Sequence, residues 1–433
     1  MKSAACTIFA GALFRAMRGA YTAAAGAAPP LAAIAALAVQ SSALAAPYVP
    51  QSGAEVLETL PRPSETASAA LLRQRAQLAA APRDPAVAAE AAQRYIELGR
   101  ASGDPRYFGY AQAALAPWWN VAAPPVPVLL LRATLLQSSH RFEEAVRDLA
   151  AVTRADPANA QAWLTLATVQ VVRGEYDAAV RSCGRLSSLA GRLASMTCLA
   201  NARAGSGQLG TSEHLLALAL ERSDAAGGAE TGDQASSQAG LRLWALTLLG
   251  ELAVRRGDAA RAEQRFRQAL VLAPADSYLL GAYADLLLDQ GRHADVQALL
   301  RNHLRVDGLL LRHTIALQAA APVRAPAAPA VASAITELQA RFDASVRRGD
   351  AIHQREQARF ELQLRYNVRT ALQLALANWQ VQKEPADLRI VLEAALAARD
   401  PAAARPALAW RRQHGLEDSK IAALVRRLEG GAI

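Results

Sequence analysis

The sequence predicts an all-α protein in which pairs of antiparallel helices stack into a solenoid, and three observations support this. The 433 residues are 52% hydrophobic but only 5% aromatic, and alanine, the best helix former, supplies much of the hydrophobic count. Apolar residues recur at helical spacing. A pattern of 34 residues, first seen from Val126 to Asn159, is then repeated. Each copy predicts a helical hairpin, which cannot bury its apolar face alone and must stack on its neighbours.

The first two copies of this pattern are adjacent in the chain. Aligned, they place Ala133 over Ala167 and Phe142 over Tyr176. The alanines hold the eighth place, where we expect the two helices to cross too closely for a larger side chain. The aromatic side chain at the seventeenth place is expected to cover the turn of the hairpin. Pro157 ends the first copy, because proline cannot continue a helix but can open the next one.

The repeated residues resemble those of the tetratricopeptide repeat, whose pattern is Trp, Leu, Gly, Tyr, Ala, Phe and Pro. The second copy follows that pattern at Trp163, Leu166, Ala167, Gly174, Tyr176, Ala179 and Cys183. The frame recurs at 193–226, 243–276 and 277–310, and 243–276 is the best copy, with Gly250, Gly257, Ala262, Phe266, Ala269 and Pro274. The resemblance implies a right-handed superhelix with a concave groove that typically holds a peptide segment of a partner protein.

Composition divides the chain further. The predicted parts are 1–45, a signal peptide; 46–63, a linker; 64–125, degenerate N-terminal helical repeats; 126–226, tetratricopeptide repeats; 227–238, a flexible insertion; 239–320, further tetratricopeptide repeats; 321–330, a proline-rich spacer; and 331–433, degenerate C-terminal helical repeats and a cap. The insertion is rich in Gly, Ser and acidic residues without an apolar period. The spacer contains three prolines, which favour an extended chain.

The first 45 residues have the pattern of an export signal. The apolar run from Leu31 to Val39 is too short to span a bilayer, and Ala43, Leu44 and Ala45 form a small-x-small cleavage site. An uncleaved membrane anchor is the competing interpretation. Translation from Met17 would give a leader of more usual length.

Trp118 and Trp119 are the densest aromatic feature of the sequence. Two interpretations remain open: a cap that seals the first full repeat, or an exposed platform for a peptide or glycan.

The charge and the short motifs of the sequence argue against nucleic-acid binding, dinucleotide binding and metal-dependent chemistry. The net charge of +9 falls to +6 without the leader, and no basic stripe with interleaved aromatics predicts nucleic-acid binding. Residues 205–210 match the dinucleotide pattern G-x-G-x-x-G, but they lie at an expected helix–helix turn rather than after a strand. His353 and Glu356 lie one turn apart on what is expected to be a solvated helix face beside Arg355 and Arg359. We therefore expect no cofactor, no metal site and no enzymatic activity.

The inner face of the repeats is the candidate binding site. Its ninth place is polar in all five framed copies, at Thr134, Thr168, Asn201, Glu251 and Asp285. The side chains either form a ladder that hydrogen-bonds a bound segment or are polar only because that face is exposed to solvent. No lysine or arginine occupies the fifth place, so the basic residues with which some family members bind a C-terminal carboxylate are absent.

Cys183 and Cys198 are the two cysteines that remain after removal of the leader, and an even count in an exported protein predicts a disulfide. Two buried free thiols are the alternative. Together the features predict a non-catalytic scaffold or assembly factor of the bacterial periplasm that binds a protein or peptide partner. The alternatives are the soluble part of an inner-membrane complex and, more remotely, an enzyme with an unrecognised site. Homo-oligomerisation is left open.

Overall fold

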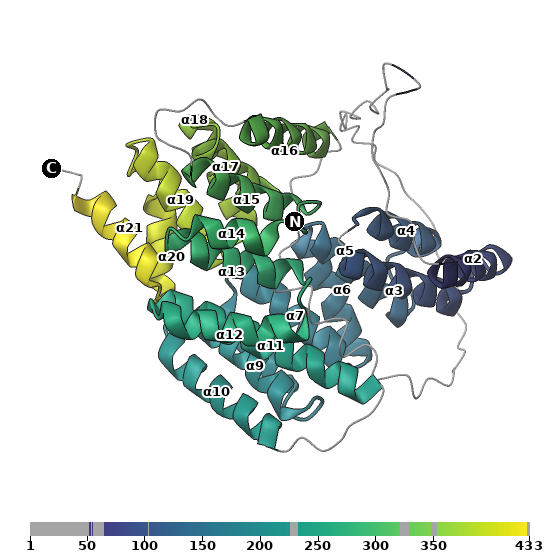
Figure 1. Cartoon of the computed structure of the whole chain (residues 1–433). Helices are drawn as coiled ribbons and strands as arrows, with labels where there is room; N and C mark the ends of the chain where they lie inside the picture. Colours follow the sequence, from purple (N-terminus) through teal and green to yellow (C-terminus); the bar gives the residue numbers. More distant parts are fainter. Residues whose placement is uncertain are drawn as a thin grey trace, which may run out of the picture.

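The structure, a computed structural model, describes residues 65–102, 104–225, 233–320, 329–347 and 353–430, together with Ser52 and Ala54. Within these residues the secondary structure is entirely helical, with 20 α-helices and no strand. The helices form a solenoid of antiparallel pairs (Figure 1), and the predicted all-α fold class is confirmed.

The helices have the following bounds. The first are α2 (Glu65–Ala80), α3 (Pro85–Ser102), α4 (Arg106–Ala114), the 3-10 helix η1 (Ala116–Trp118), α5 (Val126–Ser138), α6 (Phe142–Ala155) and α7 (Ala160–Val172). Next come α8 (Tyr176–Arg185), α9 (Arg192–Ala204), α10 (Leu209–Ala225), α11 (Asp233–Arg256), α12 (Ala259–Leu272), α13 (Ser277–Asp289) and α14 (His293–Leu300). The last are α15 (Asp307–Ala320), α16 (Pro329–Arg347), α17 (Gln354–Gln363), α18 (Val368–Val381), α19 (Pro385–Ala397), α20 (Arg405–His414) and α21 (Ser419–Gly430).

Helix boundaries follow from local capping chemistry. The side chain of Asn159 accepts a hydrogen bond from the Ala162 amide at the start of α7, and Asp258 accepts one from the Arg261 amide at the start of α12. These contacts satisfy amides that have no partner inside the helix. The pairs then turn at glycines with positive φ, such as Gly174 at +76°, a conformation that costs glycine little.

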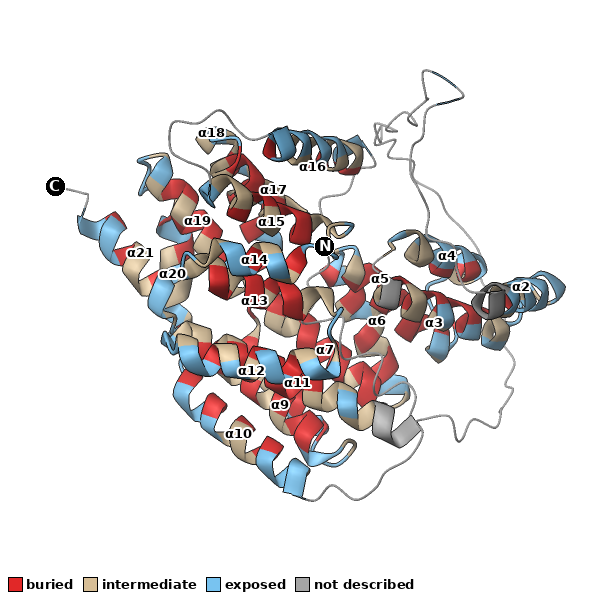
Figure 2. Cartoon of the chain, viewed as in Figure 1, coloured by how far each residue is buried: buried red, intermediate tan, exposed pale blue. Residues whose placement is uncertain are grey.

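The core lies where the helices of neighbouring pairs meet (Figure 2). At the eighth place Ala133, Ala167 and Ala284 are at most 1% exposed. In the copy at 243–276 the same place is Gly250, where a Cβ would lie 2.4 Å from the Phe266 ring. Small residues at these crossings therefore have the steric role that the repeat pattern predicted.

Parts of the predicted insertion and of the predicted spacer are helical in the structure. The prediction of a flexible insertion over 227–238 is wrong for 233–238, because α11 begins at Asp233. Alanine and glutamine are good helix formers, so the missing apolar period did not exclude a helix here. Residues 329 and 330 of the spacer open α16, with proline at its first position. The rest of the spacer, and the predicted leader, lie outside the described residues.

The C-terminal helices fold back onto the middle of the solenoid. In Figure 1 the yellow helices α19 to α21 lie beside the teal helices of the central repeats, and hydrogen bonds join them. We call α17 to α21 the C-terminal unit. None of the described helices is both long enough and apolar enough to cross a membrane.

Candidate functional site

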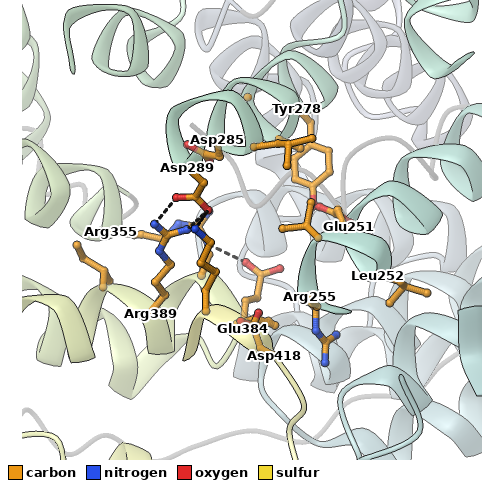
Figure 3. A pocket seen from close by; sticks show the side chains of 18 of the residues that line it. Glu251, Leu252, Arg255, Tyr278, Asp285, Asp289, Arg355, Glu384, Arg389 and Asp418 are labelled. Atoms are coloured by element: carbon orange, nitrogen blue, oxygen red, sulfur yellow. Dashed lines mark hydrogen bonds and ion pairs between the residues drawn. The ribbon is translucent and has the colours of Figure 1, made fainter. Parts of the chain in front are cut away.

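The C-terminal unit covers a cavity of 280 Å³ on the concave side of the solenoid. One wall is the inner face, formed by the first helices of four successive pairs, α7, α9, α11 and α13. The opposite wall comes from α17, α19 and the start of α21. Figure 3 shows Glu251 and Tyr278 on the first side, with Glu384 and Arg389 on the other.

The ladder predicted at the ninth place converges on this cavity. Thr168, Asn201, Glu251 and Asp285 all line it. Thr134 lies one pair earlier and is 3% exposed, with its hydroxyl donating to the Leu130 carbonyl 2.9 Å away. The Thr168 hydroxyl likewise donates to Leu164 of its own helix. The structure therefore brings four of the five positions to one cavity and leaves both threonine hydroxyls engaged with their own helices.

Exposure to solvent does not by itself account for the polarity of this face. Asp285 forms ion pairs with Arg312 of α15 and with Arg359 of α17, each at 2.5 Å. Asp289, one turn further on, pairs with Arg389 at 2.7 Å. Asp285 and Asp289 thus join the inner face to the C-terminal unit through ion pairs.

Glu356 of α17 is buried and Arg355 is half-buried, so the prediction of a solvated helix face is wrong. Arg355 donates to Glu384 at 3.0 Å and to Asp387 at 3.2 Å, and Glu356 is 5% exposed. Arg355 and Glu356 are covered because α19 packs against α17 and places Glu384 and Asp387 opposite Arg355. The spacing of residues along α17 does not reveal this contact. The arginines that line the cavity come from α11, α15, α17 and α19, and none of them is at a fifth-place position of the repeat frame.

Burial raises the pKa values of the carboxyl groups in the cavity, whereas neighbouring arginines lower them. Burial alone would raise the pKa of Asp285, but the adjacent Arg312 and Arg359 guanidinium groups lower it below its ordinary value of 3.8. Burial raises the pKa of Glu251 to about 7, although the hydrogen bond from Tyr278 works in the other direction. Burial also raises the pKa values of Glu384 and Asp387, which share Arg355. Glu251 therefore titrates near neutral pH, whereas Asp285 stays ionised.

The rim of the cavity is a series of close contacts between the turns of the central pairs and the C-terminal unit. A Cβ on Gly174 would lie 2.7 Å from the Trp410 ring, and Gly207 approaches the Gly415 carbonyl. The Glu417 carboxylate accepts a hydrogen bond from the Leu209 amide, 3.2 Å away, at the start of α10. There it caps a helix from a distant part of the chain, satisfying an amide that would otherwise lack a partner.

Trp118 and Trp119 are partly buried against the N-terminal core. Arg132 fixes this segment: it donates to the carbonyls of both tryptophans and forms a bidentate pair with Asp148. This packing agrees with the cap interpretation. The tryptophans do not line the cavity described above.

Cys183 of α8 and Cys198 of α9 are joined in the structure, with Cα atoms 5.5 Å apart. Both side chains are buried. The bridge connects the second helix of one pair to the first helix of the next, so it lies within the solenoid core and away from the cavity.

Other predicted features have no arrangement that suggests chemistry. Residues 205–208 join α9 to α10 and residues 209–210 begin α10, so a helix precedes this motif and not the strand that a dinucleotide-binding turn requires. Across the described part of the chain, no group of three or more His, Cys, Asp or Glu side chains could hold a metal ion.

Comparisons with known proteins agree with the repeat frame. The tetratricopeptide repeat family model matches residues 130–185 and 247–295, which fall on α5 to α8 and α11 to α14. Repeats of this kind suggest a protein-interaction scaffold. No curated protein matches the chain by sequence.

Two of the solved structures that are similar to this chain at low identity are the following. A tetratricopeptide repeat protein from Parabacteroides merdae is 13% identical, with a TM-score of 0.32, over 70% of this chain and 99% of that one. The human IFIT1 dimer with m7Gppp-AAAA is 14% identical, with a TM-score of 0.38, over 85% of this chain and 86% of that one. Likeness at this level says nothing about what this chain binds.

Proposed function

We propose that this protein is a non-catalytic interaction scaffold or assembly factor of the bacterial cell envelope, exported to the periplasm by its N-terminal leader. The observation that supports a binding role is the convergence of Thr168, Asn201, Glu251 and Asp285 on one cavity. Polar side chains on successive helices are what a repeat scaffold offers to a partner.

The size of the cavity limits what enters it. At 280 Å³ it lies near the lower end of ligand sites, which span roughly 300–1,000 Å³. It has room for a side chain or a chain end and not for a helix. The partner is therefore a protein that inserts a short protruding group between the inner face and the C-terminal unit, while the rest of it contacts the rim.

Site-specific photo-crosslinking in intact cells, followed by mass spectrometry, tests this proposal. A benzophenone amino acid at Ala282, which lines the cavity, is expected to capture a defined protein. The control position is Val271 on α12, which is 83% exposed and is not a cavity residue. Capture of no protein from Ala282, or of the same set of proteins from both positions, would count against the proposal.

A second experiment distinguishes the two proposed locations of the protein in the cell envelope. Cell fractionation is expected to recover the protein with the soluble periplasmic contents. Recovery of the full-length chain with the inner membrane would instead favour the soluble part of an anchored complex.

A further inference from the structure

Most charged side chains of the cavity neutralise one another. Asp285 pairs with Arg312 and Arg359, and Asp289 with Arg389 and Lys420. Glu393 shares Arg389, while Glu384 and Glu356 share Arg355. Arg255 donates to two backbone carbonyls, those of Ala204 and Glu417. The guanidinium groups thus donate to acceptors within the chain, and an anionic ligand would have to displace a carboxylate or, at Arg255, a backbone carbonyl to reach one.

Glu251 differs from these carboxyl groups. Its carboxyl accepts a hydrogen bond from the Tyr278 hydroxyl, and among the described residues no cationic group lies within ion-pair distance of it. Asp418 also lacks an ion pair there, but it accepts a hydrogen bond from the Ile421 amide as a cap of α21. Glu251 is therefore the cavity carboxyl that has no cation and no capping role.

The surroundings of Glu251 favour a cation. The titratable and charged groups that act on it are Tyr278 from α13, Glu384 from the start of α19, Arg355 from α17 and Arg255 from its own helix. Both arginines already donate to other acceptors, and Glu384 adds negative charge. Leu248, Leu252 and Leu286 also line the cavity and provide an apolar wall for an alkyl stem.

From this geometry we propose that the cavity binds a protonated amine or guanidinium group on an alkyl stem, with the Glu251 carboxylate as its counter-ion and Leu248, Leu252 and Leu286 around the stem. The Tyr278 hydroxyl orients the carboxylate by donating to it. The cation comes either from a small free amine or from a lysine or arginine side chain of a partner protein. The inference does not depend on the proposed scaffold function, because it concerns the Glu251 carboxylate, which has no counter-ion within the described residues.

Cation binding depends on whether the Glu251 carboxyl group is protonated. Because burial raises the pKa of Glu251 to about 7, the carboxyl is mostly protonated at pH 6 and mostly ionised at pH 8. A cation that binds only the ionised form then binds about tenfold more tightly at pH 8 than at pH 6. Alkylamines and guanidines remain protonated over this range, so the change reports the carboxyl group.

The test is titration calorimetry with the full mature chain at pH 6 and pH 8. The probes are n-butylammonium, n-butylguanidinium and the peptide acetyl-Gly-Gly-Lys-Gly-Gly-amide. Their uncharged counterparts are n-butanol and the same peptide with glutamine in place of lysine. We expect saturable binding of the charged probes alone, tighter at the higher pH.

Three variants assign the effect to the proposed group. Glu251→Gln is expected to lower the affinity at pH 8 by at least about tenfold and to remove its pH dependence. Tyr278→Phe removes a hydrogen bond that lowers the pKa of Glu251, so the pH midpoint of binding is expected to rise while binding persists. Glu143→Gln on α6, at an exposed position, is the control and is expected to bind as the unmodified protein does.

Each outcome decides the inference. Binding of the free cations supports it directly, and binding of the lysine peptide alone supports it and identifies the partner side chain as the source. Absence of binding by every charged probe, equal binding of n-butanol, or unchanged binding by Glu251→Gln would overturn it. Crosslinking from Ala282 tests the scaffold proposal separately, and its result does not depend on whether the charged probes bind.

Discussion

The backbone amide of Lys383 donates a hydrogen bond to the carbonyl oxygen of Val172, 2.8 Å away. Val172 is the last residue of α7, where a helix leaves carbonyl groups without partners inside the helix, and Lys383 lies just before α19. The C-terminal unit therefore completes the end of a central helix. Tyr176, Trp379 and Trp410 pack around this point, with the two tryptophan rings 5.1 Å apart.

Substitution of Gly174 tests the contribution of this contact to stability. A Cβ at this position would lie 2.7 Å from the Trp410 ring, whereas one at Gly291 would meet nothing within 4 Å. Both glycines have positive φ, so Gly174→Ala and Gly291→Ala share the cost of that conformation. We expect urea unfolding to show that Gly174→Ala loses about 1–3 kcal/mol more than Gly291→Ala. Equal losses would mean that the C-terminal unit does not pack tightly there.

Removing the charge of Asp285 should destabilise the packing of the C-terminal unit on the inner face. Asp285→Asn leaves Arg312 and Arg359 without their shared counter-ion, and their side chains are only 11% and 18% exposed. Loss of one member of a buried ion-pair group typically costs about 3–5 kcal/mol. The matched control is Asp295→Asn, whose carboxylate is 51% exposed beside Arg292; its cost is expected to stay below about 1 kcal/mol. Chemical denaturation of both variants at pH 7 provides the comparison.

Much of the repeat architecture could be predicted because its determinants are local. Ala133 and Ala167 mark helix crossings, and Gly174 and Gly257 mark turns, so one repeat length of sequence contains the information. Capping residues such as Asn159 act within one helical turn. The fold class therefore followed from periodicity, and the family model later matched two of the same segments.

The covered inner face could not be predicted because its contacts join distant parts of the chain. Arg359 and Asp285 are separated by several helices, and nothing near either residue specifies the other. Trp410, which packs on Tyr176, was not singled out at all. The increasing acidity of the ninth place towards Glu251 and Asp285, together with the basic side chains of α17, was the one available signal. It indicated charge complementarity between two segments without giving their geometry.

The stability of the protein should depend on the ionisation of Glu251. Its pKa is about 7 in the folded chain, above its ordinary value of 4.5, so the folded state retains a proton that the unfolded state has lost. The stabilising contribution is complete below pH 4.5 and is lost as pH rises through 7, and at most about 3 kcal/mol is involved. We expect the unfolding free energy of the unmodified protein to fall between pH 5 and pH 8 relative to Glu251→Gln. A constant difference would exclude Glu251 as the titrating group.

Processing of the leader gives a prediction about the residues before the fold. If the first 45 residues are an export signal, the mature protein is expected to begin between Ala45 and Tyr48. N-terminal sequencing of protein from intact cells measures this. A chain that retains the leader in the membrane fraction would favour the anchored alternative.

The disulfide between Cys183 and Cys198 should stabilise the stacking of α8 on α9. The bridge closes a loop with a sequence separation of 15, for which loop-closure entropy gives about 3 kcal/mol. Both sulfur atoms are buried in the core, so reduction should act through unfolding and not through direct access of the reductant.

Thiol counting under denaturing, non-reducing conditions is expected to find no free thiol in protein isolated from the periplasm, and reduction should lower the melting temperature. The double variant Cys183→Ala/Cys198→Ala should melt at the lower temperature with or without reductant, which separates loss of the bridge from other effects of the reductant. Two free thiols would show instead that the cysteines act only as small apolar core residues.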